Sequence, residues 1–265
     1  MYRNSLLGKM LGALLLALPV AAAQAAPIVV FDNPNYVDTA GGYSAESDTL
    51  QATLTAAGHM VTTFSSLQVS DINNALNGKH ILVIPEQERG DLGNALSNPN
   101  RNAFRNFVSN GGSLIISADY RNTLNEIFGF NLSYAYTSST SSLNSAAASG
   151  TAFAGGPATL PANDATYGFL TSSLPTGSLA LYKTGNLTTV SVMKFGSGEI
   201  VSLGWDWFNA RPLGSQNNGW LDVLNRSIDQ VSAPAQATSN VPEPGTIGLL
   251  GLGLLGLACA RRKKA

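Results

Sequence analysis

Short apolar runs alternate with longer segments of helical periodicity over the first half of the chain. The runs predict β-strands at residues 28–31, 60–64, 81–84 and 114–117. Between and after them, the spacing of apolar residues and the capping signals predict helices at 44–57, 70–76, 98–109 and 122–128. Strands that alternate with helices are typical of βαβ units, in which the strands lie parallel in one sheet.

The second half of the chain has a different pattern. Residues 131–156 are rich in Ser, Ala and Gly and have weak periodicity, so we expect a long surface excursion there. Three strands are predicted after it, at 179–182, 188–195 and 199–203. Gly196-Ser197-Gly198 suits a hairpin between the last two strands. A closing helix is predicted at 220–231, where apolar residues recur on one side.

Together these patterns predict one α/β domain over residues 27–231. We expect a doubly wound, mostly parallel sheet with helices on both faces and a late β-hairpin, similar to the flavodoxin arrangement. The net charge of the chain is −1, which gives no reason to expect nucleic acid as a partner. Charged residues make up 12% of the chain, so its surface is expected to be polar but nearly neutral.

The N-terminal segment has the pattern of a secretory signal peptide. Arg3 and Lys9 precede a short apolar run, and the small-x-small site Ala23-Gln24-Ala25 follows it. We therefore expect residues 1–25 to be removed by signal peptidase after export.

The C-terminal segment has the composition of a membrane-halting tail. A linker at 232–240 leads to Pro242-Glu243-Pro244, an apolar stretch at 246–260 expected to be transmembrane, and the basic residues Arg261 and Arg262. Residues 241–265 resemble the PEP-CTERM sorting signal. This resemblance implies a Gram-negative bacterium, the inner membrane before processing, an exosortase as processing enzyme, and frequent association with exopolysaccharide or biofilm. It places the product in the cell envelope, at the surface or in the extracellular matrix.

The order of elements over 27–231 resembles class I glutamine amidotransferase-like domains, including non-catalytic relatives attached to glycosidases. The hairpin at Gly196-Ser197-Gly198 and the following Leu203-Gly204-Trp205-Asp206 carry this resemblance. Such an enzyme needs a cysteine on a tight strand-to-helix turn. The only cysteine is Cys259, inside the apolar tail. The resemblance therefore implies a member that lacks the family's catalytic cysteine.

A serine-based site is not predicted either. Gly-x-Ser-x-Gly is absent, and the only histidines, His59 and His80, begin predicted strands. They are expected at the N-terminal edge of the sheet, opposite the edge where sites form in such folds. The sequence predicts no cofactor and no particular metal, and it favours a non-enzymatic domain.

Candidate ligand-binding residues follow the predicted strands. Asp32 follows the first, Glu86 the third, and Asp119 and Tyr120 the fourth. A second group, Trp205-Asp206-Trp207, combines an acid with aromatic rings that could stack on sugars. Paired carboxylates at this edge could bind Ca²⁺ or Mg²⁺ or form hydrogen bonds with sugar hydroxyls. The alternative interpretation is that the acids cap helices and the tryptophans pack in the core.

Three functional hypotheses remain open. The first is a non-catalytic binding domain, with polysaccharide as ligand. The second is a carbohydrate-active hydrolase using Asp32, Glu86 and Asp119, and the third is a structural scaffold without a ligand site. Two of these carboxylates facing each other across an open cleft would favour the hydrolase.

Overall fold

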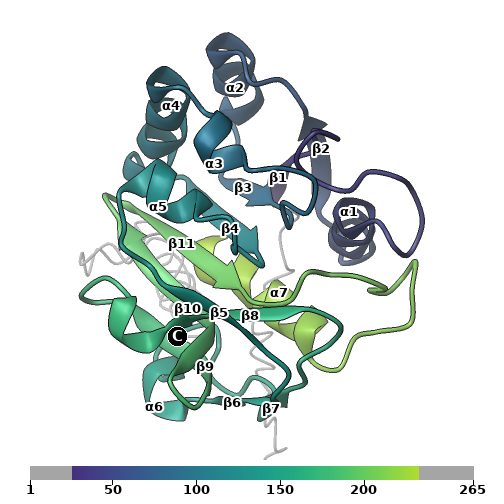
Figure 1. Ribbon diagram of the computed structural model, residues 1–265, viewed down its shortest axis with the longest axis vertical. Coiled ribbons are helices and arrows are strands. Elements are labelled where there is room, and N and C mark those ends of the chain that lie inside the picture. Colours follow the sequence, from purple (N-terminus) through teal and green to yellow (C-terminus); the bar gives the residue numbers. More distant parts are fainter. Residues whose placement is uncertain (1–25, 233–265) are drawn as a thin grey trace, which may run out of the picture.

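A computed structural model describes residues 26–232, which form a central sheet with helices on both faces (Figure 1). Five strands are mutually parallel and lie in the order β2-β1-β3-β4-β11. They are β2 (Met60–Phe64), β1 (Pro27–Phe31), β3 (Ile81–Ile84), β4 (Ser113–Ser117) and β11 (Gly198–Leu203). The predicted βαβ connections that link β1, β2, β3 and β4 are therefore present. The strand order reverses beside β1, as in doubly wound sheets.

The rest of the sheet is antiparallel. Strand β10 (Leu187–Phe195) pairs with β11 as the expected hairpin and continues the sheet to β9 (Leu179–Thr184), β6 (Ser141–Leu143) and β7 (Thr159–Leu160). One further strand, β8 (Thr166–Leu170), branches from β10, and β5 (Tyr134–Thr137) pairs with β8.

Side-chain alternation along the parallel strands divides the core into two clusters. Ile28 and Val30 point to the face covered by α1 (Glu46–Ala56) and α7 (Trp220–Ser232). Val29 and Phe31 point to the opposite face. That face is covered by α2 (Val69–Leu76), α3 (Leu92–Ala95), α4 (Asn98–Ser109) and α5 (Thr123–Phe128). Because successive strand residues face opposite ways, an all-apolar strand such as β3 serves both clusters.

Two expectations from the sequence were wrong. The sheet is mixed rather than mostly parallel: among residues 26–232, four strand pairs are parallel and six are antiparallel. Residues 131–156 are not a simple surface excursion, because they contain β5, β6 and the short helix α6 (Ser145–Ala148). These strands are short and rich in Ser, Thr and Tyr, and they gain their stability from pairing with partners distant in sequence.

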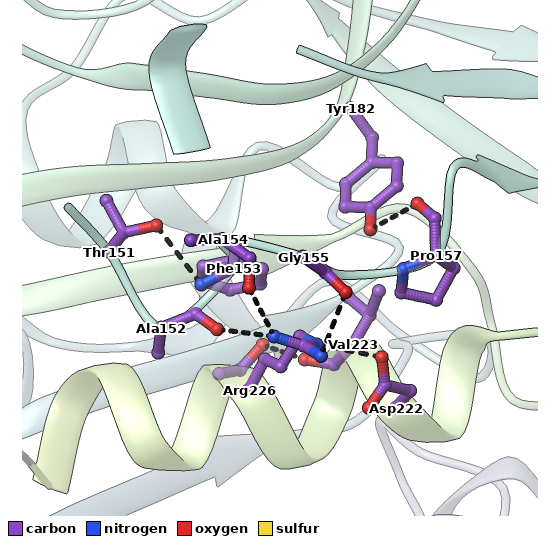
Figure 2. A network of polar contacts seen from close by, with 11 residues as sticks. Thr151, Ala152, Phe153, Ala154, Gly155, Pro157, Tyr182, Asp222, Val223 and Arg226 are labelled. Atoms are coloured by element: carbon purple, nitrogen blue, oxygen red, sulfur yellow. Dashed lines mark hydrogen bonds and ion pairs between the residues drawn. The ribbon is translucent and has the colours of Figure 1, made fainter. Parts of the chain in front are cut away.

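A cluster of polar contacts fastens the loop after α6 to the closing helix (Figure 2). We call it the Arg226 cluster. The Arg226 guanidinium donates to the carbonyls of Ala152 (2.8 Å), Ala154 (3.0 Å) and Gly155 (3.3 Å). It also donates to the Asp222 carboxylate, one helical turn away, at 2.8 Å. One cation thus satisfies several loop carbonyls that would otherwise lack donors.

Several expectations fall on residues outside the described range. These are the signal peptide at 1–25, the linker at 232–240 apart from its first residue, and the sorting tail with its apolar stretch at 246–260. Within residues 26–232, no helix is long and apolar enough to cross a membrane.

Candidate functional site

The carboxyl ends of the parallel strands meet at one edge of the sheet. An open cleft of about 640 Å³ lies at this edge. Among the residues that the structure describes, its lining contains no Lys, Arg or His, but it contains six acids: Asp38, Glu46, Glu86, Glu88, Asp164 and Asp206. We call it the acidic cleft. It lies where ligands bind in open α/β sheets, outside the carboxyl ends of the strands.

Three carboxylates converge in this cleft from three different elements. Glu46 lies in the first turn of α1, Glu86 follows β3, and Asp206 follows β11. One oxygen from each lies within 4.8 Å of one oxygen from each of the other two. The three residues are nearly buried, with exposed fractions of 6%, 5% and 5%. Like charges so close together, and removed from water, disfavour ionisation.

The pKa values of the three acids reflect this crowding. Burial raises the pKa of Glu86 to about 9, and the nearby charges of Asp206 and Glu46 add to the effect. Burial also raises the pKa of Asp206 and of Glu46 to about 7 each. The backbone N–H of Phe208, which donates to Asp206 at 3.0 Å, acts in the opposite direction. At neutral pH, therefore, the group holds protons that ordinary carboxylic acids would have lost.

The antiparallel half of the sheet positions Asp206. The amide of Tyr167 in β8 donates to the carbonyl of Gly204 (2.8 Å), and the amide of Asp206 donates to the carbonyl of Ala165 (3.2 Å). A Cβ at position 204 would collide with the Tyr167 carbonyl, so this close approach requires glycine. The next residue after Asp206, Trp207, has a φ of +78°. Such strain in a bulky residue is maintained only by the surrounding structure.

One side of the cleft is aromatic. Tyr120 and Tyr167, which both line it, stack with ring centroids 4.7 Å apart. The exposed rings of Tyr134 and Tyr136 contact Tyr167 edge to face. Burial raises the pKa of Tyr120 to about 12, and the Glu86 charge contributes in the same direction. Both features keep the Tyr120 hydroxyl protonated and able to donate a hydrogen bond.

The predicted ligand-binding residues do not all reach the cleft. Glu86, Tyr120 and Asp206 line it, but Asp32 and Asp119 do not. The Asp119 carboxylate accepts from the amides of Thr123 (2.9 Å) and Leu124 (3.0 Å), at the start of α5. Asp32 accepts from the Ser47 hydroxyl at 2.7 Å. Asp119 therefore serves as a helix cap, and the three acids named for a hydrolase are not brought together.

Trp205 and Trp207 lie in the core rather than in the cleft. Both are fully buried, their ring centroids are 4.7 Å apart, and Trp205 also contacts Trp220 of the closing helix. Neither ring can stack on a sugar. The aromatic residue of this segment that does line the cleft is Phe208.

Sequence reasoning missed several cleft residues. Glu46 was predicted only as part of a helix. It lies in the first turn of α1, the helix that follows the first strand, and that position places it at the carboxyl edge of the sheet, so the sequence did contain a signal for it. Asp164 and Tyr167 lie in a segment where no strand was predicted, so no pattern pointed to them.

The histidines lie away from the cleft. His59 precedes β2 and His80 precedes β3, at the opposite edge of the sheet, and neither lines the cleft. Residues 26–232 contain no cysteine.

Comparisons with known proteins bear on the fold and on the tail. Residues 240–263 match the PEP-CTERM protein-sorting motif. No curated protein matches the chain. A protein from Bacteroides uniformis described as ThuA-like is similar in structure, with a TM-score of 0.55 at 10% identity, covering 83% of this chain and 97% of the other. The mmIFT52 N-terminal domain has a TM-score of 0.54 at 11% identity, covering 78% and 97% of the two chains.

A third similar structure is described as part of a GMP synthase from Thermoplasma acidophilum. Its TM-score is 0.53 at 11% identity, and the match covers 80% of this chain and 96% of the other. At these identities the likenesses show a shared α/β fold and nothing about activity. The motif shows more: the protein is exported to the cell envelope of a Gram-negative bacterium and is processed by an exosortase.

Proposed function

We propose that residues 26–232 form a non-enzymatic carbohydrate-binding domain of an exported envelope or matrix protein, and that the acidic cleft is its binding site. The stacked pair Tyr120 and Tyr167 beside buried carboxylates is the observation that carries this proposal. Sugar hydroxyls donate hydrogen bonds, carboxyl oxygens accept them, and an aromatic face covers the apolar face of a sugar ring. An exopolysaccharide is the ligand that suits an exosortase substrate.

The positions of the predicted hydrolase acids support binding rather than hydrolysis. Glu86 lines the acidic cleft, but Asp32 and Asp119 do not. Asp32 and Asp119, which a hydrolase would need in addition to Glu86, are held in other hydrogen bonds.

One observation favours hydrolysis as a second candidate. A general acid must hold its proton at neutral pH, and the raised pKa of Glu86, about 9, meets that requirement. Hydrolysis therefore stays as an outcome to be measured, by release of new reducing ends from any polysaccharide that the protein binds.

A glycan array probed with the full-length protein in detergent tests the proposal. We expect retention of particular polysaccharides, and a loss of at least about tenfold in affinity for Tyr167→Ala, because stacking of an aromatic ring is removed. Phe130→Ala is the matched control, since it removes a half-buried ring beside Phe195, outside the cleft. A blank array, or equal losses in both variants, would count for a scaffold without this site.

A further inference from the structure

Three nearly buried carboxyl groups, those of Glu46, Glu86 and Asp206, form what we call the floor of the acidic cleft, and they lack an ion-pair partner among the described residues. Four ion pairs occur among residues 26–232, and none of them includes Glu46, Glu86 or Asp206. Arg89, which lies outside the lining, pairs with two other acids of the cleft, Asp38 at 2.8 Å and Glu88 at 3.8 Å. The charge of Arg121 acts on Glu86 and lowers its pKa, but the two residues form no ion pair. Buried carboxylates are normally paired with a cation or coordinate a metal ion.

An unpartnered oxygen independently points to a ligand. Glu46 Oε2 is fully buried and accepts no hydrogen bond from any described residue. Buried polar atoms in folded proteins nearly always have a partner, so an exception calls for an explanation such as a bound ion. This oxygen belongs to a residue that lines the cleft and is 6% exposed.

The oxygens lie close enough together to share one divalent cation. One oxygen from each of the three carboxylates lies within 4.8 Å of the other two, and two ligands that each lie about 2.4 Å from one Ca²⁺ can be up to about 4.8 Å apart. Mg²⁺ demands near-ideal octahedral geometry and usually keeps several waters, so a group of protein carboxylates suits calcium better. Calcium also takes six to eight oxygens in flexible geometry, and it accepts both monodentate and bidentate carboxylates.

We propose that Glu46, Glu86 and Asp206 form a calcium-binding site in the floor of the cleft. The three ligands come from the start of α1, the end of β3 and the loop after β11, so the ion would tie the two ends of the described chain together. The calcium site lies in the cleft proposed to bind carbohydrate, but it does not depend on that function, because a protein that binds calcium and no glycan would still contain it.

Calorimetric titration of the full-length protein with CaCl₂, after treatment with EDTA, tests this proposal. We expect one site with a dissociation constant of about 0.1–1 mM, the range of extracellular calcium modules. Glu86→Gln and Asp206→Asn each remove one ligand charge, and each is expected to weaken binding at least about tenfold. MgCl₂ is expected to bind more weakly than CaCl₂.

Two matched controls keep the test specific. Glu199→Gln makes the same change in β11 near its opposite end, and Asp229→Asn makes it on the exposed side of α7. Both are expected to bind calcium within about twofold of the unaltered protein, because neither lies in the cleft. Circular dichroism verifies that each variant is folded, and Glu46→Gln replaces any variant that is not.

Three outcomes would overturn the proposal. They are no calcium binding by the unaltered protein at millimolar concentration, unchanged affinity in the folded cleft variants, and equal losses in cleft and control variants. Tighter binding of Mg²⁺ than of Ca²⁺ would overturn the assignment to calcium. A blank glycan array together with calcium binding would reject the proposed function alone.

Discussion

The Arg226 cluster and the acidic cleft are both groups of charged residues, yet they are built in opposite ways. In the Arg226 cluster one cation meets three carbonyls and one carboxylate, and each nitrogen of the guanidinium has an acceptor. In the cleft, carboxylates of like charge face one another, and one buried oxygen has no partner among the described residues. A charged cluster whose polar atoms all have partners stabilises the fold. A cluster with unpartnered polar atoms must be held in place by the surrounding structure, and its free atoms are available to a ligand.

The pH dependence of stability should separate the two regions most strongly. Glu86 has a raised pKa in the folded protein, about 9, so between pH 4.5 and 9 the folded state holds a proton that the unfolded chain has lost. The stabilising effect of this proton is complete below the unfolded pKa and is lost as pH rises through the folded pKa. In EDTA, we expect the free energy of unfolding to fall from pH 5 to pH 9, with Glu86 alone contributing up to about 1.4 kcal/mol for each pH unit. Glu46 and Asp206, whose pKa values are raised to about 7, add to the fall below pH 7.

Urea unfolding at several pH values measures this effect. The Glu86→Gln variant cannot ionise at this position, so its stability should fall less steeply over the same range, while Arg226→Met should keep the slope of the unaltered protein. A Glu86→Gln slope equal to that of the unaltered protein would show that Glu86 titrates normally and that the cleft is not as crowded as its geometry indicates.

Removing the cation of the Arg226 cluster should destabilise the protein. Arg226→Met keeps part of the packing volume but leaves the carbonyls of Ala152, Ala154 and Gly155 without this donor. We expect the free energy of unfolding to fall by about 2–3 kcal/mol, because hydrogen bonds to a charged group are lost. Calcium affinity should stay the same. A coupled loss of calcium binding would mean that the two regions are not independent.

Asp119 follows β4 as Glu86 follows β3, but its carboxylate has hydrogen-bond partners. We therefore expect it to contribute to stability, as Arg226 does, rather than to ligand binding. Asp119→Ala removes the acceptor for the first amides of α5 and should cost about 1–2 kcal/mol, the usual range for a lost helix cap. Asp119→Asn retains an acceptor oxygen and should cost less. Thermal unfolding followed by circular dichroism compares the two variants, and a larger effect on ligand affinity than on stability would return Asp119 to the binding site.

The smallest effect is expected from the exposed end of the Arg226 cluster. Asp222 is one helical turn from Arg226, and its side chain is 47% exposed. Exposed pairs at this spacing contribute about 0.3–0.5 kcal/mol. Asp222→Ala should therefore change the midpoint of urea unfolding only slightly. A loss as large as that of Arg226→Met would show that Asp222 orients the guanidinium and that the cluster acts as one unit.

The local pattern of the sequence determined the parallel half of the fold and the destination of the protein. Continuous apolar runs such as Ile81–Ile84 can be buried only between two layers, and each lies next to a helix signal of its own. The sorting motif is a contiguous segment whose composition is enough to identify it. Such features depend on neighbours within about ten residues, so they can be recognised from the sequence without the tertiary structure.

Only the tertiary structure decided which polar residues form the site. Asp119 and Glu86 both follow a strand, but the helix α5 begins close enough to Asp119 to take its oxygens, whereas Glu86 stays free to meet Glu46 and Asp206. The tryptophans at 205 and 207 turn into the core, and Asp206 between them turns into the cleft, because β8 holds the backbone there. The three carboxylates of the site are 40 to 160 positions apart in the chain, a separation at which sequence periodicity contains no information.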